Sequence, residues 1–409
     1  MLPILVADVS NNRSKEGGLV PRVSSEIVIT GLGETAVGRL PGWNSVQLQA
    51  MAVLAAVQDA GLTVRDVDGL INLDPYADPQ SMFSTTLAEY LGITPSWVST
   101  VDVGGTVSGM TMLQQAIWAI ESGYCTTVVC VYGENTLTGR ADDRQGLDLH
   151  NKLGAEEWED PFGAHGMVVP YALLSQRYLD LYGGDYDDFA AVAVNTRRHA
   201  QMNENAQMRK PLDMEMCRQA RPISTPLRLF DCSLISDGAG AIVLQARTKR
   251  LNADRPAVRV SSFGVRCTHN YVAEAPDLEQ LGMADAAAEA FNSAGIGPED
   301  FDLAELHDAF TISVLYTLEA LGICKPGRSG AWIRAGHAAI GGKCPVNTHG
   351  GLLSQAHIGG MLHITEAVRQ LRGEAANRQV EGARRAVVSG NGGVFSVCGV
   401  MVMERDDVA

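Results

Sequence analysis

The feature that most restricts the fold of this 409-residue chain is an internal repeat of a helix–glycine–strand unit. Residues 59–62 and 66–68 are matched by residues 293–296 and 300–302, and an alanine-rich helical pattern precedes both stretches. A supersecondary unit that recurs in the same order indicates duplicated architecture, so the match predicts two related α/β halves. Two unrelated helix–glycine–strand units can also look alike, and this simpler explanation stays open on the sequence alone.

Strand-like and helical segments alternate beyond the repeat, which favours a layered α/β fold with buried strands. Continuous or alternating apolar runs predict strands, and apolar residues at three- and four-residue spacing predict helices. The predicted strands are 26–30, 67–73, 126–132, 239–245, 258–263, 303–306, 386–389 and 397–403, and the predicted helices are 46–61, 108–122, 171–182, 187–200, 283–294, 311–321 and 361–371.

The chain divides into a tail, two halves and an insertion. Residues 1–24 have no periodic pattern, and we leave this tail out of the fold. We predict a first half over residues 25–250 and a second half over residues 251–409. Residues 134–230 carry most of the Asp, Arg and Met clusters, which indicates a loop or cap inserted into the first half.

The net charge of −15 argues against a general nucleic-acid-binding protein, which would present a basic face. A few local cations on an acidic protein can still hold a phosphorylated substrate. No apolar run reaches the ~18 residues that span a bilayer, and the start lacks a signal-peptide pattern. Eight cysteines without a CxxC pair fit reduced thiols rather than a zinc or redox site. We therefore expect a cytoplasmic protein without a membrane span, a nucleic-acid partner or a metal.

The first candidate for chemistry is His307, followed by Asp308, between the strand at 303–306 and the helix that starts at 311. Backbone N–H groups and the helix dipole favour developing negative charge at such a place. Asp308 fits an orienting or capping role better than a reacting one. A packed histidine near a helix cap explains the same pattern, and the sequence alone does not decide between these interpretations.

A second group of candidates contains His349 and His357, both crowded by glycines. Gly350 and Gly351 would let a substrate approach the backbone closely, so these two glycines and His349 are candidates for substrate binding. His357 lies in a loop that enters the helix at 361, a suitable place for a general base.

Asn391, Gly392 and Gly393 end a predicted buried strand and could present N–H groups as an oxyanion hole. A tight hairpin turn before the strand at 397–403 is the alternative interpretation of this tract.

The turn at residues 104–109 stands where a nucleophile would gain from a helix N-terminus, but it carries Thr106 there. No residue from 101 to 124 is a cysteine. Since a threonine hydroxyl is far less ionised than a thiol near pH 7, covalent catalysis through this position is disfavoured.

These motifs together resemble the thiolase superfamily, and within it the sterol-carrier-protein-X thiolase branch, often labelled lipid-transfer proteins. Residues 306–310, Leu-His-Asp-Ala-Phe, look like the HDCF-type motif of that branch, with alanine in place of cysteine. Residues 347–357 resemble the stretch that carries the catalytic GHP histidine, with Ile358 in place of the proline. Residues 236–239 resemble the DGA turn, and the likeness covers roughly residues 25–405.

The resemblance implies a thiolase fold: two related βαβαβ-type halves in a layered αβαβα arrangement with an inserted loop domain. It also implies a homodimer that binds acyl-CoA through the loop domain, with coenzyme A as part of the substrate and no tightly bound cofactor. His307 and His357 would flank the thioester carbonyl, with the Gly392–Gly393 backbone close by. Thr106 stands where family thiolases place the nucleophilic cysteine of a C-x-S-G turn, and the second cysteine, of the C-x-G turn, is also missing.

A subgroup of this branch that lacks the nucleophile is similar to the steroid side-chain aldolases, which work with a small partner bearing an OB-fold and a zinc ribbon. Likeness to them implies retro-aldol cleavage of a β-hydroxyacyl-CoA that releases acetyl- or propionyl-CoA. His357 would be the base, and His307 with the backbone near Gly392 would stabilise the enolate. The steroid aldolases tend to have tyrosines where this chain has the two histidines.

Two alternatives remain open on the sequence. A conventional thiolase or acyltransferase would need another thiol in the site, such as Cys125 or Cys398. A catalytically silent subunit would bind acyl-CoA without turnover.

Overall fold

The computed structural model describes residues 23–139, 158–251, 255–278 and 281–406. Residues 1–22 of the predicted tail and residues 140–157 of the predicted insertion lie outside the described residues.

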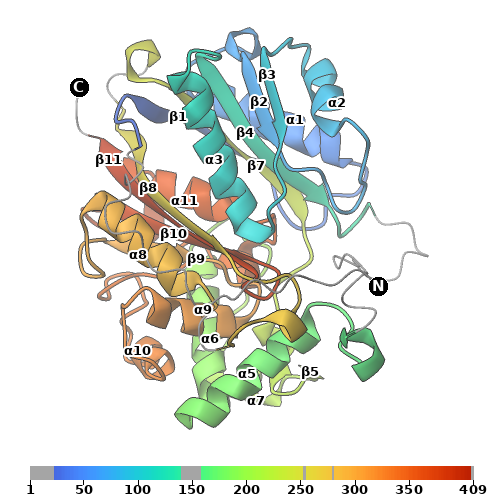
Figure 1. Ribbon diagram of the computed structural model, residues 1–409, viewed down its shortest axis with the longest axis vertical. Coiled ribbons are helices and arrows are strands. Elements are labelled where there is room, and N and C mark those ends of the chain that lie inside the picture. The colour runs from blue at the N-terminus through green and yellow to red at the C-terminus, as the bar shows by residue number, and fades with distance from the viewer. Residues whose placement is uncertain (1–22, 140–157, 252–254, 279–280, 407–409) are drawn as a thin grey trace, which may run out of the picture.

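The described part of the chain contains a nine-stranded mixed sheet in the order β3-β2-β4-β7-β1-β8-β11-β10-β9 (Figure 1). Its two halves meet where β1 pairs with β8 through one residue pair, Ile29 with Val258. The strands of the first half are β1 (Ile27–Glu34), β2 (Gly69–Asn72), β3 (Trp97–Thr100), β4 (Thr127–Asn135) and β7 (Asp237–Ala246). Those of the second half are β8 (Ala257–Cys267), β9 (Leu303–Leu306), β10 (Arg385–Gly392) and β11 (Val397–Asp406).

Strand pairing is the same in both halves. In the first half β2 runs parallel to β4, and β4, β7 and β1 follow as antiparallel neighbours. In the second half β9 runs parallel to β10, and β10, β11 and β8 follow as antiparallel neighbours. The repeat predicted from the sequence is thus a repeat of topology, which decides against a chance likeness of two units.

The helices form three layers around the two half-sheets. The central layer is α3 (Gly105–Glu121) and α11 (Met361–Arg372), which contact strands of both halves. On the outer faces, α1 (Ser45–Asp59) and α2 (Phe83–Leu91) cover the first half, while α8 (Met283–Ala294) covers β8 and β11. Nearly every residue of α11 is buried, as expected for a helix between two sheets. This is the predicted αβαβα arrangement.

Local sequence explains how the outer layer packs. Asn44 caps α1 and forms a capping box with Gln47, so this helix starts where its first N–H groups find acceptors. Gly31 in β1 faces the same helix, and a Cβ atom there would lie 2.1 Å from the carbonyl oxygen of Ala56. Glycine therefore sets the close approach of β1 and α1.

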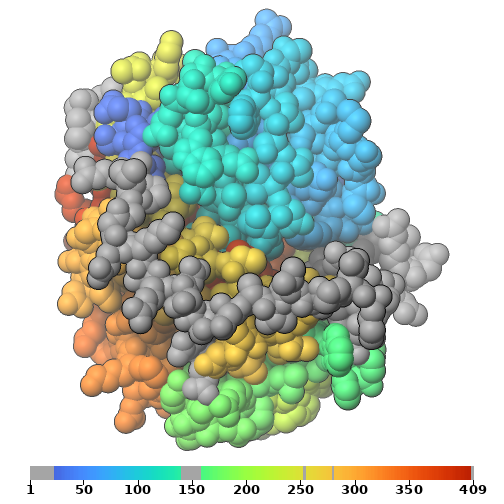
Figure 2. Space-filling view, in the orientation of Figure 1, coloured from blue at the N-terminus to red at the C-terminus, as the bar shows by residue number. Residues whose placement is uncertain are grey.

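The helices and strands described between β4 and β7 lie at the end of the molecule away from β3 and α2, coloured green in Figures 1 and 2. These elements are inserted into the first half, but α6 packs against the second half. It contacts α9, α10 and a π-helical turn, Gly351–Gln355. The inserted elements are α5 (Val168–Tyr182), α6 (Tyr186–Gln201), α7 (Met214–Gln219), β5 (Pro222–Ser224) and β6 (Leu227–Arg228), and their partners are α9 (Thr311–Ala320) and α10 (Ser329–Arg334). Among the described residues, every helix is too short or too polar to cross a lipid bilayer.

Candidate active site

A cavity of about 680 Å³ lies where the carboxyl ends of the parallel strands of both halves converge. In α/β sheets this end of the strands is the usual place for a ligand. Each half contributes residues from the carboxyl ends of its strands and from loops next to them. The first half supplies Leu73, Tyr76, Tyr132, Glu134 and Thr136, and the second half supplies His307, His357 and the turn Asn391, Gly392 and Gly393.

His307 follows β9 directly, so the end of this short buried strand places its ring at the cavity. Its Nδ1 lies 2.6 Å from the Oγ1 of Thr106, in the first turn of α3. Burial, with a smaller contribution from nearby His357, lowers the pKa of His307 to about 3. The imidazole is therefore neutral at physiological pH.

His357 stands across from His307, with 6.3 Å between the ring centroids. Its Nδ1 lies 3.0 Å from the hydroxyl of Ser233, and its backbone N–H donates to Ser236 at 3.1 Å. Burial lowers the pKa of His357 to about 4, so this ring is also neutral near pH 7 and can accept a proton. The structure thus brings the two predicted catalytic histidines together.

The turn of Asn391, Gly392 and Gly393 has the hairpin structure that one of the two interpretations predicted, and its role as an oxyanion hole stays a prediction. It begins the hairpin that joins β10 to β11, and all three residues line the cavity. The Asn391 amide donates to the Tyr171 hydroxyl at 2.6 Å, and this hydroxyl donates to the carbonyl of Gly393 at 2.8 Å. Tyr171 therefore holds the turn in place.

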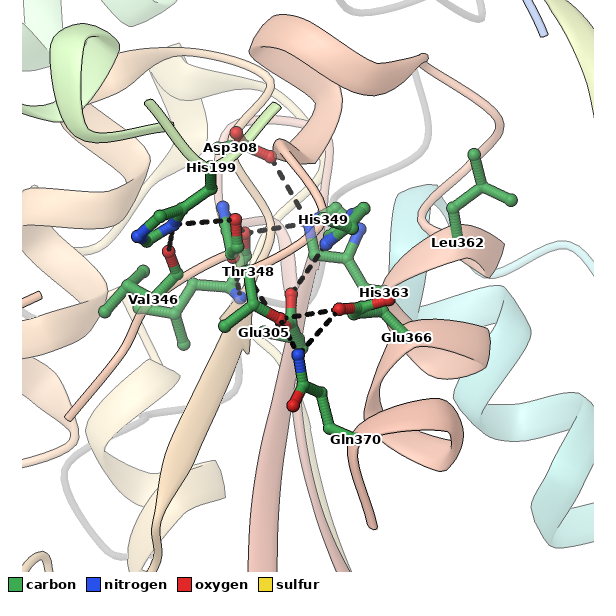
Figure 3. A network of polar contacts seen from close by, with 12 residues as sticks. His199, Glu305, Asp308, Val346, Thr348, His349, Leu362, His363, Glu366 and Gln370 are labelled. Atoms are coloured by element: carbon green, nitrogen blue, oxygen red, sulfur yellow. Dashed lines mark hydrogen bonds and ion pairs between the residues drawn. The ribbon is translucent and has the colours of Figure 1, made fainter. Parts of the chain in front are cut away.

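Asp308 and His349 lie behind the cavity wall in a buried polar network (Figure 3). Asp308 accepts the backbone N–H of Leu352 at 2.7 Å and lies 3.2 Å from His363. Although burial raises the pKa of Asp308, the contact with His363 holds it below its usual range. The carboxylate orients the π-helical turn and is not among the residues that line the cavity.

His349 pairs with Glu305 at 2.8 Å in the same network (Figure 3). Burial lowers the pKa of His349, but the Glu305 carboxylate more than offsets this and raises it. Gly350 and Gly351 have φ angles of +109° and +57°, and a Cβ on Gly351 would lie 2.0 Å from the Asp308 carboxylate. None of these three predicted substrate-binding residues is among those that line the cavity, so their observed contacts are structural.

Sequence reasoning missed the polar wall that the first half contributes. Glu134 is buried and accepts the Tyr132 hydroxyl at 2.6 Å, the Ala77 N–H at 3.2 Å and the Thr136 hydroxyl at 3.1 Å. Burial raises the pKa of Glu134, and burial beside this carboxylate raises the pKa of Tyr132 well above its usual value. The sequence signal that could have predicted this wall is Glu134, a carboxylate at the carboxyl end of a continuous apolar strand.

The cysteines do not supply the missing nucleophile at the predicted positions. Cys125 and Cys398 are buried, and burial raises the pKa of both thiols. Among the described residues that line the cavity, Cys267 is the one cysteine, and there is no Lys or Arg. In the same described part of the chain, no three His, Cys, Asp or Glu side chains gather as metal ligands.

Comparison with known proteins identifies the family. A family profile described as "Thiolase C-terminal domain-like" matches residues 264–405. The chain is 33% identical over 376 residues to the steroid side-chain-cleaving aldolase of Thermomonospora curvata, covering 89% of this chain and 95% of that one. It is 32% identical over 384 residues to the 17-hydroxy-3-oxo-4-pregnene-20-carboxyl-CoA lyase of Mycobacterium tuberculosis, covering 91% and 98%.

Among solved structures, the Ltp2-ChsH2(DUF35) aldolase matches with a TM-score of 0.83 at 30% identity, covering 95% of this chain and 100% of that one. Human mitochondrial 3-ketoacyl-CoA thiolase in complex with CoA matches with a TM-score of 0.70 at 16% identity, covering 93% and 98%, which bears on the fold alone. The chain belongs to the thiolase superfamily, in the sterol-carrier-protein-X branch that includes the steroid side-chain-cleaving aldolases.

Proposed function

We propose that this protein is a carbon–carbon lyase that cleaves a β-hydroxyacyl-CoA by a retro-aldol reaction. The protein is an enzyme that acts on acyl-CoA, as its relatives are CoA lyases and acetyl-CoA acetyltransferases. The observation that carries the proposal is the pairing of two cavity histidines with a buried Thr106 at the nucleophile position. Retro-aldol cleavage needs a base and an enolate site, and it needs no acyl-enzyme.

In the proposed reaction His357 takes the proton of the β-hydroxyl group. The Cα–Cβ bond then breaks, the β-carbon becomes a carbonyl, and the bond's electron pair forms the enolate of the thioester. His307 and the backbone of Gly392 and Gly393 stabilise the enolate oxygen. Return of the proton to Cα gives acetyl- or propionyl-CoA.

The cavity lining supports a bulky apolar acyl part. Leu73, Met167, Phe310 and Val394 are among the side chains that surround it. Since its described lining contains no cation, we assign this cavity to the acyl and thioester part of the substrate. A steroid side chain is the class of substrate that the named relatives support.

We also propose that the enzyme works as a homodimer with a small partner subunit of the OB-fold and zinc-ribbon type. The name of the structural neighbour joins Ltp2 to ChsH2(DUF35), and a relative from Thauera aromatica, 36% identical over 233 residues, is named a thiolase subunit. Within this chain, β3 is an edge strand of the sheet and Val98 on it is 46% exposed. An edge of this kind supports strand pairing between two copies.

The test is the identity of the products with and without free CoA. The full-length protein, alone and with a purified protein of the OB-fold and zinc-ribbon type, is given a β-hydroxyacyl-CoA with a bulky chain. A carbonyl product with no consumption of CoA supports the lyase. Consumption of CoA, or an acyl-enzyme seen by intact mass, would establish a thiolase instead.

The cysteine that lines the cavity provides the matched control for that test. A thiolase route would have to use Cys267, because the two candidates predicted from the sequence lie in the core. For a lyase, Cys267→Ser leaves the carbonyl product and its rate within about twofold, because the retro-aldol reaction uses no thiol. Loss of turnover together with loss of an acyl-enzyme mass would support the thiolase.

A further inference from the structure

Thr106 is held against His307 rather than presented to the cavity. Its side chain is fully buried, and it is absent from the described residues that line the cavity. Gly360 packs against it from the other side, since a Cβ at this glycine would lie 1.8 Å from the Thr106 Oγ1. The hydroxyl is therefore confined between α11 and the His307 ring.

The direction of the 2.6 Å hydrogen bond follows from this confinement. A buried hydroxyl proton needs an acceptor, and the structure offers it the Nδ1 of His307. If His307 donated instead, the hydroxyl proton of Thr106 would be buried without an acceptor, which is unfavourable. Thr106 therefore donates to Nδ1, and a neutral His307 must carry its proton on Nε2.

His357 has a hydroxyl partner of a different kind. Ser233 is half-buried and lines the cavity, so its hydroxyl proton can turn toward a ligand or water. His357 can then donate from Nδ1 to Ser233 at 3.0 Å and keep a lone pair on Nε2. The two histidines differ in which ring nitrogen carries the proton, because the hydroxyl of Thr106 is buried in the core and that of Ser233 is open to the cavity.

We propose that Thr106 is a positioning residue that locks His307 in the Nε2–H tautomer, so that this ring donates a hydrogen bond to the thioester oxygen as the enolate forms. The inference rests on the proposed function, since it assigns His307 to the enolate oxygen. The residue at the former nucleophile position thus orients the donor instead of attacking the substrate. His357 remains free to act as the base.

The tautomer can be measured without any reaction. Two-bond ¹H–¹⁵N correlation spectra of the full-length protein labelled with ¹⁵N-histidine distinguish Nδ1–H from Nε2–H, and His307→Gln assigns the signals. We expect Nε2–H for His307 in the native protein and in Thr106→Ser, and a mixture of tautomers in Thr106→Val. Ser233→Ala is the matched control and leaves the His307 signals unchanged. An Nδ1–H tautomer in the native protein, or Nε2–H retained in Thr106→Val, would overturn the proposal.

Enolate formation supplies the second readout. Exchange of the Cα hydrogens of propionyl-CoA in deuterated water reports on the enolate alone, and thermal unfolding confirms that each variant is folded. We expect Thr106→Val to slow this exchange at least ~10-fold with little change in KM, because a misaligned oxyanion donor acts on the transition state, and Thr106→Ser to restore it. Equal exchange in the native protein and Thr106→Val would overturn the role of Thr106 while leaving the lyase proposal in place. Absence of carbon–carbon cleavage with the tautomer confirmed would count against the lyase alone.

Discussion

The two halves of this molecule share a strand topology but deliver different chemistry to the cavity between them. The second half contributes neutral imidazoles and a glycine turn, His307, His357 and Gly392. The first half contributes a phenol and a carboxylate, Tyr132 and Glu134, from the carboxyl end of β4. The backbone arrangement is repeated because both halves bury the same kind of sheet. The side chains that reach the cavity from strand ends and loops serve the site rather than the sheet, so they are free to differ.

This comparison predicts that the chemical step depends most on the second half. His357→Ala removes the proposed base, and kcat is expected to fall by ~10²- to 10⁴-fold. The measurement is single-turnover cleavage of a β-hydroxyacyl-CoA, compared with Ser233→Ala, which keeps the ring and removes its Nδ1 partner. Cleavage at an unchanged rate in His357→Ala would remove this residue from the mechanism.

The second half is also expected to depend on its buried ion pair for stability. In His349→Leu the Glu305 carboxylate stays buried without its partner, so the free energy of unfolding is expected to fall by about 3 kcal/mol. Because the pKa of His349 is raised in the folded protein, its contribution is present below about pH 6.5 and is lost as the pH rises through the folded-state value. The loss measured by urea unfolding should therefore be larger at pH 6 than at pH 9. The exposed pair of Arg218 and Asp187 is the control, and Arg218→Ala should cause no resolvable change.

The first half should affect substrate selection more than the chemical step. Tyr132 donates its proton to Glu134, so its oxygen can accept a hydrogen bond from the substrate. Tyr132→Phe is expected to lower kcat/KM by ~10-fold through the loss of one hydrogen bond near a carboxylate. Tyr76→Phe, whose hydroxyl contacts Asp102 at 3.1 Å, is the neighbouring control with a smaller effect. If Tyr132→Phe changed kcat as much as His357→Ala, the proposed division of labour would be wrong.

The smallest expected effect is a flat pH profile near neutrality. Since burial lowers the pKa of His357 to about 4 and of His307 to about 3, both rings stay neutral between pH 6 and pH 8. The value of kcat/KM should change less than about twofold over that range and fall only as the pH approaches 4. Assays after a rapid pH jump separate this titration from unfolding. An acid limb near pH 6.5, the value of an unperturbed histidine, would show that the pKa of the catalytic histidine is not lowered in the free enzyme.

Much of the fold could be read from local pattern. The strand Leu303–Leu306 and the helix Met283–Ala294 have the predicted bounds, because each has a clear apolar period and a distinct stop signal. The helix α2 and the edge strand β3 were not predicted. With four residues and alternate burial, β3 is too short to give a secure period, and its existence depends on pairing with β2.

The candidate site shows where pattern stops being informative. The sequence placed His307 and Asp308 together, and His349 close to His357, but it could not say which of each pair faces the cavity. The backbone at a strand end or in a glycine turn sets those directions, and two consecutive side chains can point to opposite sides. Only the folded chain puts His307 and His357 into the cavity and Asp308 and His349 behind it.

By itself, the sequence determined the duplicated α/β architecture, the family, the two histidines and the absence of a cysteine at the nucleophile turn. These features depend on residue types and on spacing over short distances along the chain. The tertiary structure decided the hydrogen-bond partners. It pairs Thr106 with His307, 201 residues away, and Ser233 with His357, 124 residues away. It also places the pair of Tyr132 and Glu134 in the cavity wall. Residues distant in the sequence pack around each hydroxyl and decide whether it is buried or open to the cavity. This exposure in turn decides which ring nitrogen of the partner histidine carries the proton.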